Sequence, residues 1–188
     1  MGSIISPTVE RVLYNVYFLE KRKGKKRQKR LSDAVFENLK ELIKAKNAAH
    51  ESMFKFSWKK LWPFSLIWPQ VDYIRIQRFM GEVKEKAILQ KQFIQDNLGS
   101  SSPEEKEFLN AIPAYVDALG NSCDKLARVA EFKQNILEKK QKRDPFAFNR
   151  ILKDYEDAQA TLVRAGAFVQ VAWGSLAPNR NKSQHAGN

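Results

Sequence analysis

Apolar residues recur every three or four positions along most of this chain, which is the spacing of one face of an α-helix. The spacing predicts helices over about 7–20, 32–50, 71–98, 102–120, 122–142 and 145–173. No segment shows the sustained alternation of apolar and polar residues that a strand requires. The chain is therefore predicted to be all-α, a single-domain bundle of about five to six helices.

Capping residues and helix breakers set the predicted helix ends. Ser102 and Asp144 each precede a proline, and a capping residue followed by proline opens a helix. Gly99 and Gly120 are placed as C-terminal stops, and Pro113 predicts a kink. These signals separate the helix over 102–120 from the one over 122–142.

Two stretches interrupt the helical pattern. Residues 53–69 carry two Trp-Pro steps, and proline and the residue before it resist helix, so an irregular connection is expected there. Residues 175–188 are polar and rich in turn formers, which predicts a flexible tail. The bundle domain is accordingly expected to span 1–174.

The positive charge of the chain is unevenly distributed. The net charge is +12, and residues 1–60 hold 15 Lys or Arg against 6 Asp or Glu, whereas the remainder holds 18 against 15. A one-sided positive field attracts polyanions such as nucleic acid or acidic lipid headgroups.

The densest basic run is KRKGKKRQKR at 21–30, with eight basic residues in ten. Such a run is expected to stay solvated, because its charges repel one another. A solubilising loop, a nuclear localisation patch and a polyanion contact are all consistent with it, and its density favours the contact. Its members are Lys21, Arg22, Lys23, Lys25, Lys26, Arg27, Lys29 and Arg30.

Aromatic rings and lysines are interleaved in the connection that follows. The rings could enter a membrane interface while the lysines meet acidic headgroups, or they could stack on single-stranded nucleic acid. They could equally close one end of the bundle as core. The residues concerned are Phe54, Phe56, Trp58, Trp62, Phe64 and Trp68, with Lys55, Lys59 and Lys60.

The first six residues, MGSIIS, match the N-myristoylation pattern with Gly2 as acceptor. One acyl chain anchors weakly and is normally joined by a polybasic segment, which 21–30 would provide. Two observations oppose acylation. Ser6 and Pro7 are already explained as the start of a helix, and Met-Gly-Ser is also a common cloning remnant.

Near the C-terminus, Arg180 to His185 reads RNKSQH and resembles the R-N-x-x-x-H motif of HEPN ribonucleases, an all-helical family. The resemblance implies that Arg180 and His185 act on a scissile phosphate, in paired motifs at a dimer interface. It covers six residues, and it departs from the family pattern because the motif there lies within a packed helix with chain beyond it.

Other chemistry finds little support in the residue types. His50 and His185 are the only histidines, and neither is spaced with Cys123 as a metal-ligand pair, so no metal site and no cofactor are expected. The single cysteine favours a reducing compartment. With no apolar run near 20 residues and no signal sequence, the protein is expected in the cytoplasm, at most on the cytoplasmic face of a membrane.

These observations favour a non-enzymatic module that docks peripherally on an acidic surface, a membrane first, through the basic run and the Trp- and Lys-rich connection. Nucleic-acid binding, including a ribonuclease of HEPN type, is the alternative. A helical subunit of a larger assembly, with the aromatic segment as its protein interface, is the third hypothesis. No small-molecule substrate is evident.

Overall fold

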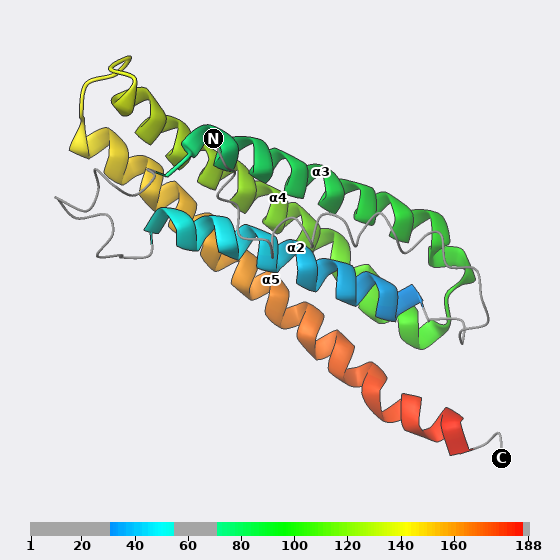
Figure 1. Cartoon of the computed structure of the whole chain (residues 1–188). Helices are drawn as coiled ribbons and strands as arrows, with labels where there is room; N and C mark the ends of the chain where they lie inside the picture. Colours follow the sequence, from blue (N-terminus) through cyan, green and yellow to red (C-terminus); the bar gives the residue numbers. More distant parts are fainter. Residues whose placement is uncertain (1–30, 55–70, 186–188) are drawn as a thin grey trace.

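The computed structural model describes residues 31–54 and 71–185, with side chains up to 176. Four α-helices make up the described part: α2 (Leu31–Phe54), α3 (Tyr73–Asn97), α4 (Pro103–Leu137) and α5 (Pro145–His185). A short 3-10 helix, η3 (Leu98–Ser100), follows α3. These helices run up and down side by side (Figure 1), and the described ranges contain no strand. The all-α bundle is confirmed, with four described helices rather than five to six.

Side-chain caps begin three of the helices, and those at Ser102 and Asp144 are the caps that the sequence predicts. Asp72 accepts a hydrogen bond from the backbone N of Arg75 at 2.9 Å, and Ser102 accepts one from Glu105 N at 3.3 Å. Asp144 Oδ1 accepts two, from the backbone N atoms of Phe146 and Ala147, at 2.9 and 3.0 Å. Each cap satisfies N–H groups that the first helical turn leaves without a partner.

The break expected at Gly120 is absent, so the two helices predicted over 102–120 and 122–142 are one helix, α4. Its pattern of buried residues continues through the glycine, because Leu119 and Cys123 on either side are fully buried. A glycine inside a helix costs only about 1 kcal/mol relative to alanine, less than burial of these neighbours returns. The helix then ends at Leu137, earlier than the predicted 142.

The end of α5 also differs from expectation. The helix continues through residues 175–185, where a flexible tail was predicted, so helix does not stop at Gly174. Trp173 stacks on Phe36 of α2 with ring centroids 4.1 Å apart, and Leu176 is buried. Packing of Trp173 and Leu176 supports the helix on both sides of Gly174. Figure 1 shows the last turns of α5 projecting beyond the other helices.

Helix α4 is the centre of the bundle, and the core is built around it. Its fully buried side chains meet α3 on one side and α5 on the other, and each contributes about 1.5–3 kcal/mol by leaving water. Helix α2 extends to Phe54, four residues beyond the predicted end at His50. The predicted helix over 7–20 and the connection from residue 55 lie outside the described residues. The central side chains are Phe108, Leu109, Ile112, Leu119, Leu126 and Val129.

Candidate functional site

Most of the residues predicted to make contact lie outside the described part of the chain. This holds for Gly2, for all eight basic residues of 21–30, and for Lys55, Lys59, Lys60, Phe56, Trp58, Trp62, Phe64 and Trp68. Arg180 and His185 lie in helical backbone at the end of α5, where side chains are not described. Phe54 is the one predicted contact residue whose side chain is described.

Phe54 closes α2 and packs against the bundle. Its ring lies parallel to that of Tyr155 on α5, with centroids 6.0 Å apart, and 4.8 Å from the imidazole of His50. Aromatic pairs at these separations are stabilising, beyond the area that they bury. The chain therefore leaves α2 from a fixed point on the bundle.

Lys133 of α4 joins this point to the other helices. Its Nζ lies 5.0 Å from the ring centroid of Phe54, 5.9 Å from that of Tyr73 on α3 and 5.6 Å from that of Phe148 on α5. A cation over an aromatic face is attracted to it, by about 0.5–1 kcal/mol at exposed sites. Both ends of segment 55–70 are therefore attached at one end of the bundle, where α4 stops and α5 begins.

The basic run 21–30 directly precedes α2, which begins at the opposite end of the bundle. Ser32, in the first turn of α2, donates through its Oγ to Glu105 Oε1 at 2.7 Å, beside the start of α4. Helix α2 has 24 residues, so its two ends are ~36 Å apart. The two predicted contact segments are therefore attached to different ends of the bundle.

A polar cluster lies inside the bundle, where α2, α4 and α5 meet. Lys46 is fully buried, and its Nζ donates to Gln159 Oε1, which also accepts from Ser122 Oγ at 2.8 Å. The Tyr155 ring lies beneath the ammonium, with its centroid 5.5 Å away. No carboxylate is among these partners, and burial lowers the pKa of Lys46 to about 8.

Two further titratable groups border this cluster. Burial raises the pKa of the Cys123 thiol to about 12, despite the nearby Lys46, so the thiol stays protonated and is a poor nucleophile. Tyr155 Oη and His50 Nδ1 share a hydrogen bond of 2.8 Å. Burial, and then the charge of Lys46, lower the pKa of His50, which keeps the imidazole neutral at pH 7.

Within the polar cluster, Lys46, Ser122 and Cys123 are fully buried, whereas Gln159 is partly exposed. Its polar atoms satisfy one another across three helices, as buried polar groups generally must. Within the described ranges, no group of three or more His, Cys, Asp and Glu residues could hold a metal ion. The arrangement is that of an internal hydrogen-bond network rather than a site open to a substrate.

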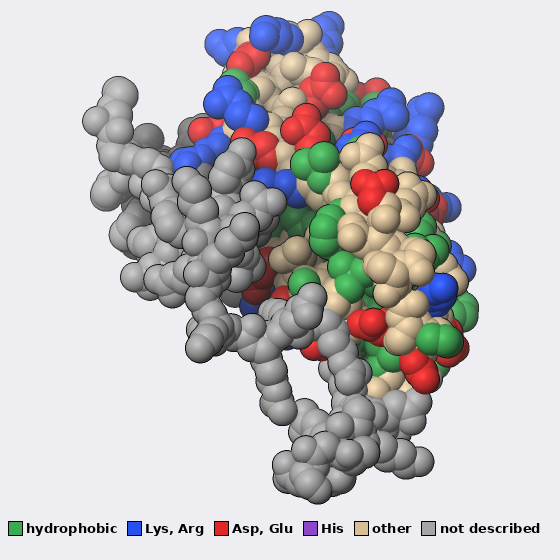
Figure 2. Space-filling view, turned by 90° about the vertical axis from the view of Figure 1, so that its right-hand side faces the viewer, with side chains coloured by type: hydrophobic (Ala, Val, Ile, Leu, Met, Phe, Trp, Pro, Cys, Tyr) green, Lys and Arg blue, Asp and Glu red, His purple; other side chains and the backbone are tan. Residues whose placement is uncertain are grey.

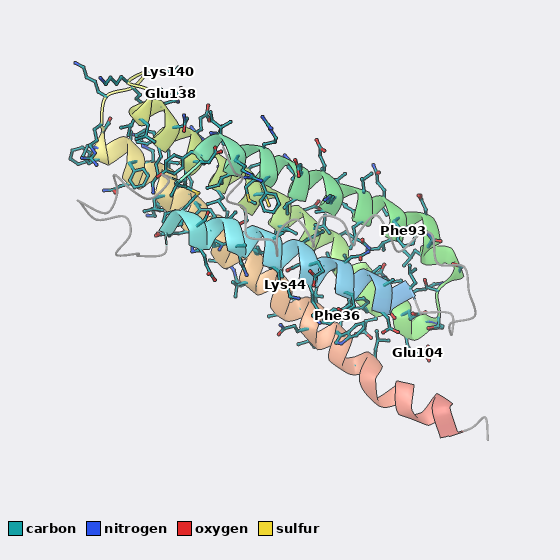
Figure 3. The ribbon with its side chains drawn as sticks, in the orientation of Figure 1. Phe36, Lys44, Phe93, Glu104, Glu138 and Lys140 are labelled. Carbon is teal, nitrogen blue, oxygen red and sulfur yellow. The ribbon has the colours of Figure 1, made fainter. Side chains whose placement is uncertain are left out.

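A second basic segment lies on the surface of the bundle. The apolar spacing of the sequence predicts helix for most of this segment, but the structure has a loop there. The α4–α5 loop, residues 138–144, carries four basic residues in the five positions 139–143, all of them exposed. The string KKQKR could have indicated a basic contact site, but the apolar spacing around it predicts a helix up to residue 142. Figure 3 shows Lys140 and Glu138 at the far end of α4, and Figure 2 shows basic side chains gathered at that height.

None of the described helices is long and apolar enough to span a lipid bilayer. Comparison with protein-family models, with curated proteins and with solved structures finds no match for this chain.

Proposed function

We propose that this protein is a peripheral module that docks on an acidic membrane surface. The distribution of charge supports this function. Residues 31–54 and 71–185 hold 21 Lys or Arg against 19 Asp or Glu, whereas residues 1–30 and 55–70 hold 12 against 2. The excess charge thus belongs to two segments next to the bundle, and the bundle itself is nearly neutral.

A membrane suits segment 55–70 because its lysines alternate with large aromatic rings. Trp58, Trp62 and Trp68 are of the type that settles at the bilayer interface, where one part of the ring is apolar and another is polar. Each basic residue near an acidic leaflet contributes about 1 kcal/mol. Lys133 contacts Phe54 and Tyr73, which lie next to the two ends of the segment, so both ends are attached at one end of the bundle. This arrangement supports contact of the lysines and the rings with the same surface.

Co-sedimentation with vesicles tests the proposal. The protein is expected to pellet with phosphatidylcholine vesicles that contain phosphatidylserine, and to be released as salt is raised, because salt screens charges beyond about 8 Å at physiological strength. Vesicles of phosphatidylcholine alone are the control. A protein that remains in the supernatant with both kinds of vesicle does not have this function.

Nucleic-acid binding, with ribonuclease activity of HEPN type, is the second candidate. The observation that favours it is the helical backbone of α5 through Arg180 and His185, which gives the R-N-x-x-x-H string a helical setting. Titration with labelled RNA at two salt concentrations measures phosphate contacts through the salt slope. RNA cleavage that is lost in His185→Ala would place this activity first.

A further inference from the structure

The end of the bundle formed by residues 137–146, here called the tip, is exposed along its whole length. It consists of the last residue of α4, the α4–α5 loop and the first two residues of α5. The ring of Phe146 is 84% exposed and Leu137 is 52% exposed, beside the four basic side chains of the loop. A surface that combines apolar and basic side chains in this way resembles those that bind acidic interfaces.

The two acidic residues of the tip are already engaged. Glu138 Oε2 pairs with Lys140 Nζ at 2.6 Å, and the carboxylate of Asp144 caps α5. Hydrogen bonds from Lys140 and Gln134 lower the pKa of Glu138, so it stays ionised. The tip holds four basic against two acidic residues, a net charge of +2, and Lys139, Lys142 and Arg143 are its basic side chains outside the pair with Glu138.

Two features of the tip affect the stability of the fold in opposite ways. Lys139 has a φ of 57°, the left-handed conformation that commonly ends a helix, and it allows Lys140 N and Gln141 N to donate to Asn135 O at 2.9 and 3.2 Å. Phe146 leaves a large ring in water. Local choices that oppose stability are expected at functional sites.

The tip also lies at the end of the bundle where α2 ends and segment 55–70 is attached. Lys133 contacts Phe54, the last residue of α2, and Phe148, one helical turn into α5 from the loop. The tip is thus close to this attachment point, whereas the run 21–30 is attached ~36 Å away, at the other end of α2.

We infer that the tip binds anionic phospholipid headgroups, with Lys139, Lys142 and Arg143 on the phosphates and Phe146 in the interface, so that the bundle docks end-on. This inference rests on the proposed function, since it requires a membrane partner. It adds which surface makes contact and how the bundle is oriented.

Charge removal tests the contact residues. The variant Lys139→Gln/Lys142→Gln/Arg143→Gln is expected to bind acidic vesicles ~100-fold more weakly, because each basic residue at an acidic surface contributes about fivefold. The control Lys40→Gln/Lys44→Gln/Arg164→Gln removes the same charge from exposed positions away from the tip and is expected to bind nearly as wild type. Circular dichroism and thermal melting establish that both variants fold.

The exposed phenylalanines provide a second matched pair on one helix. Phe146→Ser is expected to weaken binding by about tenfold, the lower range for a ring that loses burial. Phe168→Ser, at a ring 72% exposed and distant from the tip, is expected to have no effect. Equal effects from the two changes would overturn the contact at Phe146.

Environment-sensitive labels test the orientation, because Cys123 is fully buried and leaves introduced thiols as the reactive ones. An NBD label on Gln141→Cys in the tip is expected to brighten with acidic vesicles, and one on Ser100→Cys at the opposite end is not. A response from Ser100→Cys alone would overturn the inference while leaving membrane docking intact. If wild type binds no vesicle, the proposed function fails first. If the tip variants lose only RNA binding, the tip serves a nucleic acid and the inference is wrong.

Discussion

At the scale of single residues, Lys46 is the most unusual position in the described structure. Its ammonium is fully buried, with an amide oxygen and an aromatic ring as neighbours instead of a carboxylate. Desolvation therefore disfavours the charged form and lowers its pKa to about 8, against about 10.4 in an unfolded chain. Below pH 8 the folded protein retains the penalty of a buried charge.

The pH dependence follows from this lowered pKa. Between pH 8 and 10 the unfolded chain binds a proton at Lys46 that the folded protein has released, so the contribution of this group to stability rises with pH. Relative to Lys46→Met, wild type should gain about 1 kcal/mol of unfolding free energy between pH 8 and 9. Urea unfolding at several pH values measures the difference.

The comparison between variants is needed because Cys123 acts in the opposite direction. Its pKa is raised by burial, so it contributes stability that is lost as pH rises above the ordinary thiol value. This effect is present in wild type and in Lys46→Met and cancels in the difference. Lys44→Met, two positions away at an exposed lysine, is the control that should leave the profile between pH 8 and 9 unchanged, because the hydrogen bond with Glu41 raises the pKa of Lys44 further above this range. A parallel profile for wild type and Lys46→Met would show that Lys46 titrates normally.

At the scale of the element, Gly120 and Gly166 show how the neighbouring side chains determine whether a helical position tolerates a larger residue than glycine. Gly120 lies in the middle of α4, where a Cβ would meet Lys84 Cγ at 3.6 Å, an ordinary contact. At Gly166 of α5 a Cβ would approach Tyr115 Cε2 to 3.3 Å, which is tight against a buried ring. The two positions share helical backbone and differ in the space around them.

Alanine substitution distinguishes these environments. Gly120→Ala should raise the unfolding free energy by about 0.5–1 kcal/mol, because alanine loses less backbone entropy in a helix. Gly81→Ala in α3, with nothing within 4 Å, should show a similar gain, and Gly166→Ala a smaller gain or a loss. Denaturant unfolding measures all three. Destabilisation by Gly120→Ala would mean that the position requires glycine, as a helix end does.

At the scale of the whole molecule, folding and charge are separable. The described bundle is almost balanced in charge, and its ion pairs lie at the surface, where each contributes about 0–1 kcal/mol. The eight basic residues of 21–30 are therefore not expected to support the fold. Their role is expected in attraction to a polyanion, which acts over longer range.

Replacing these eight basic residues by glutamine should leave the melting temperature unchanged and, because the bundle docks end-on through the tip, weaken binding to acidic vesicles less than removal of the tip charges does. Differential scanning fluorimetry and co-sedimentation measure the two effects on one protein. The tip and the lysines of 55–60 remain in that variant, so binding should be reduced without being abolished. A lower melting temperature would instead indicate that the run packs against the bundle.

The sequence alone determined the helical class, three helix starts and the uneven charge, because apolar spacing, capping residues and formal charge are local properties. It did not determine that α4 continues through Gly120, or that α5 continues past Gly174, since in both places burial against other helices outweighs local preference. Nor could it show that Lys46 is buried.

The relation between the contact segments was likewise decided by tertiary structure. In the sequence, the run 21–30 and the segment 55–70 appear as one basic region, separated by a single helix. That helix attaches them at opposite ends of the bundle, and the contacts of Lys133 with Phe54 and Phe148 show that the second attachment point is at the end that carries the exposed loop 138–144. Proximity in the chain and proximity in space differ here because the intervening helix has 24 residues, which separates the two attachment points by ~36 Å.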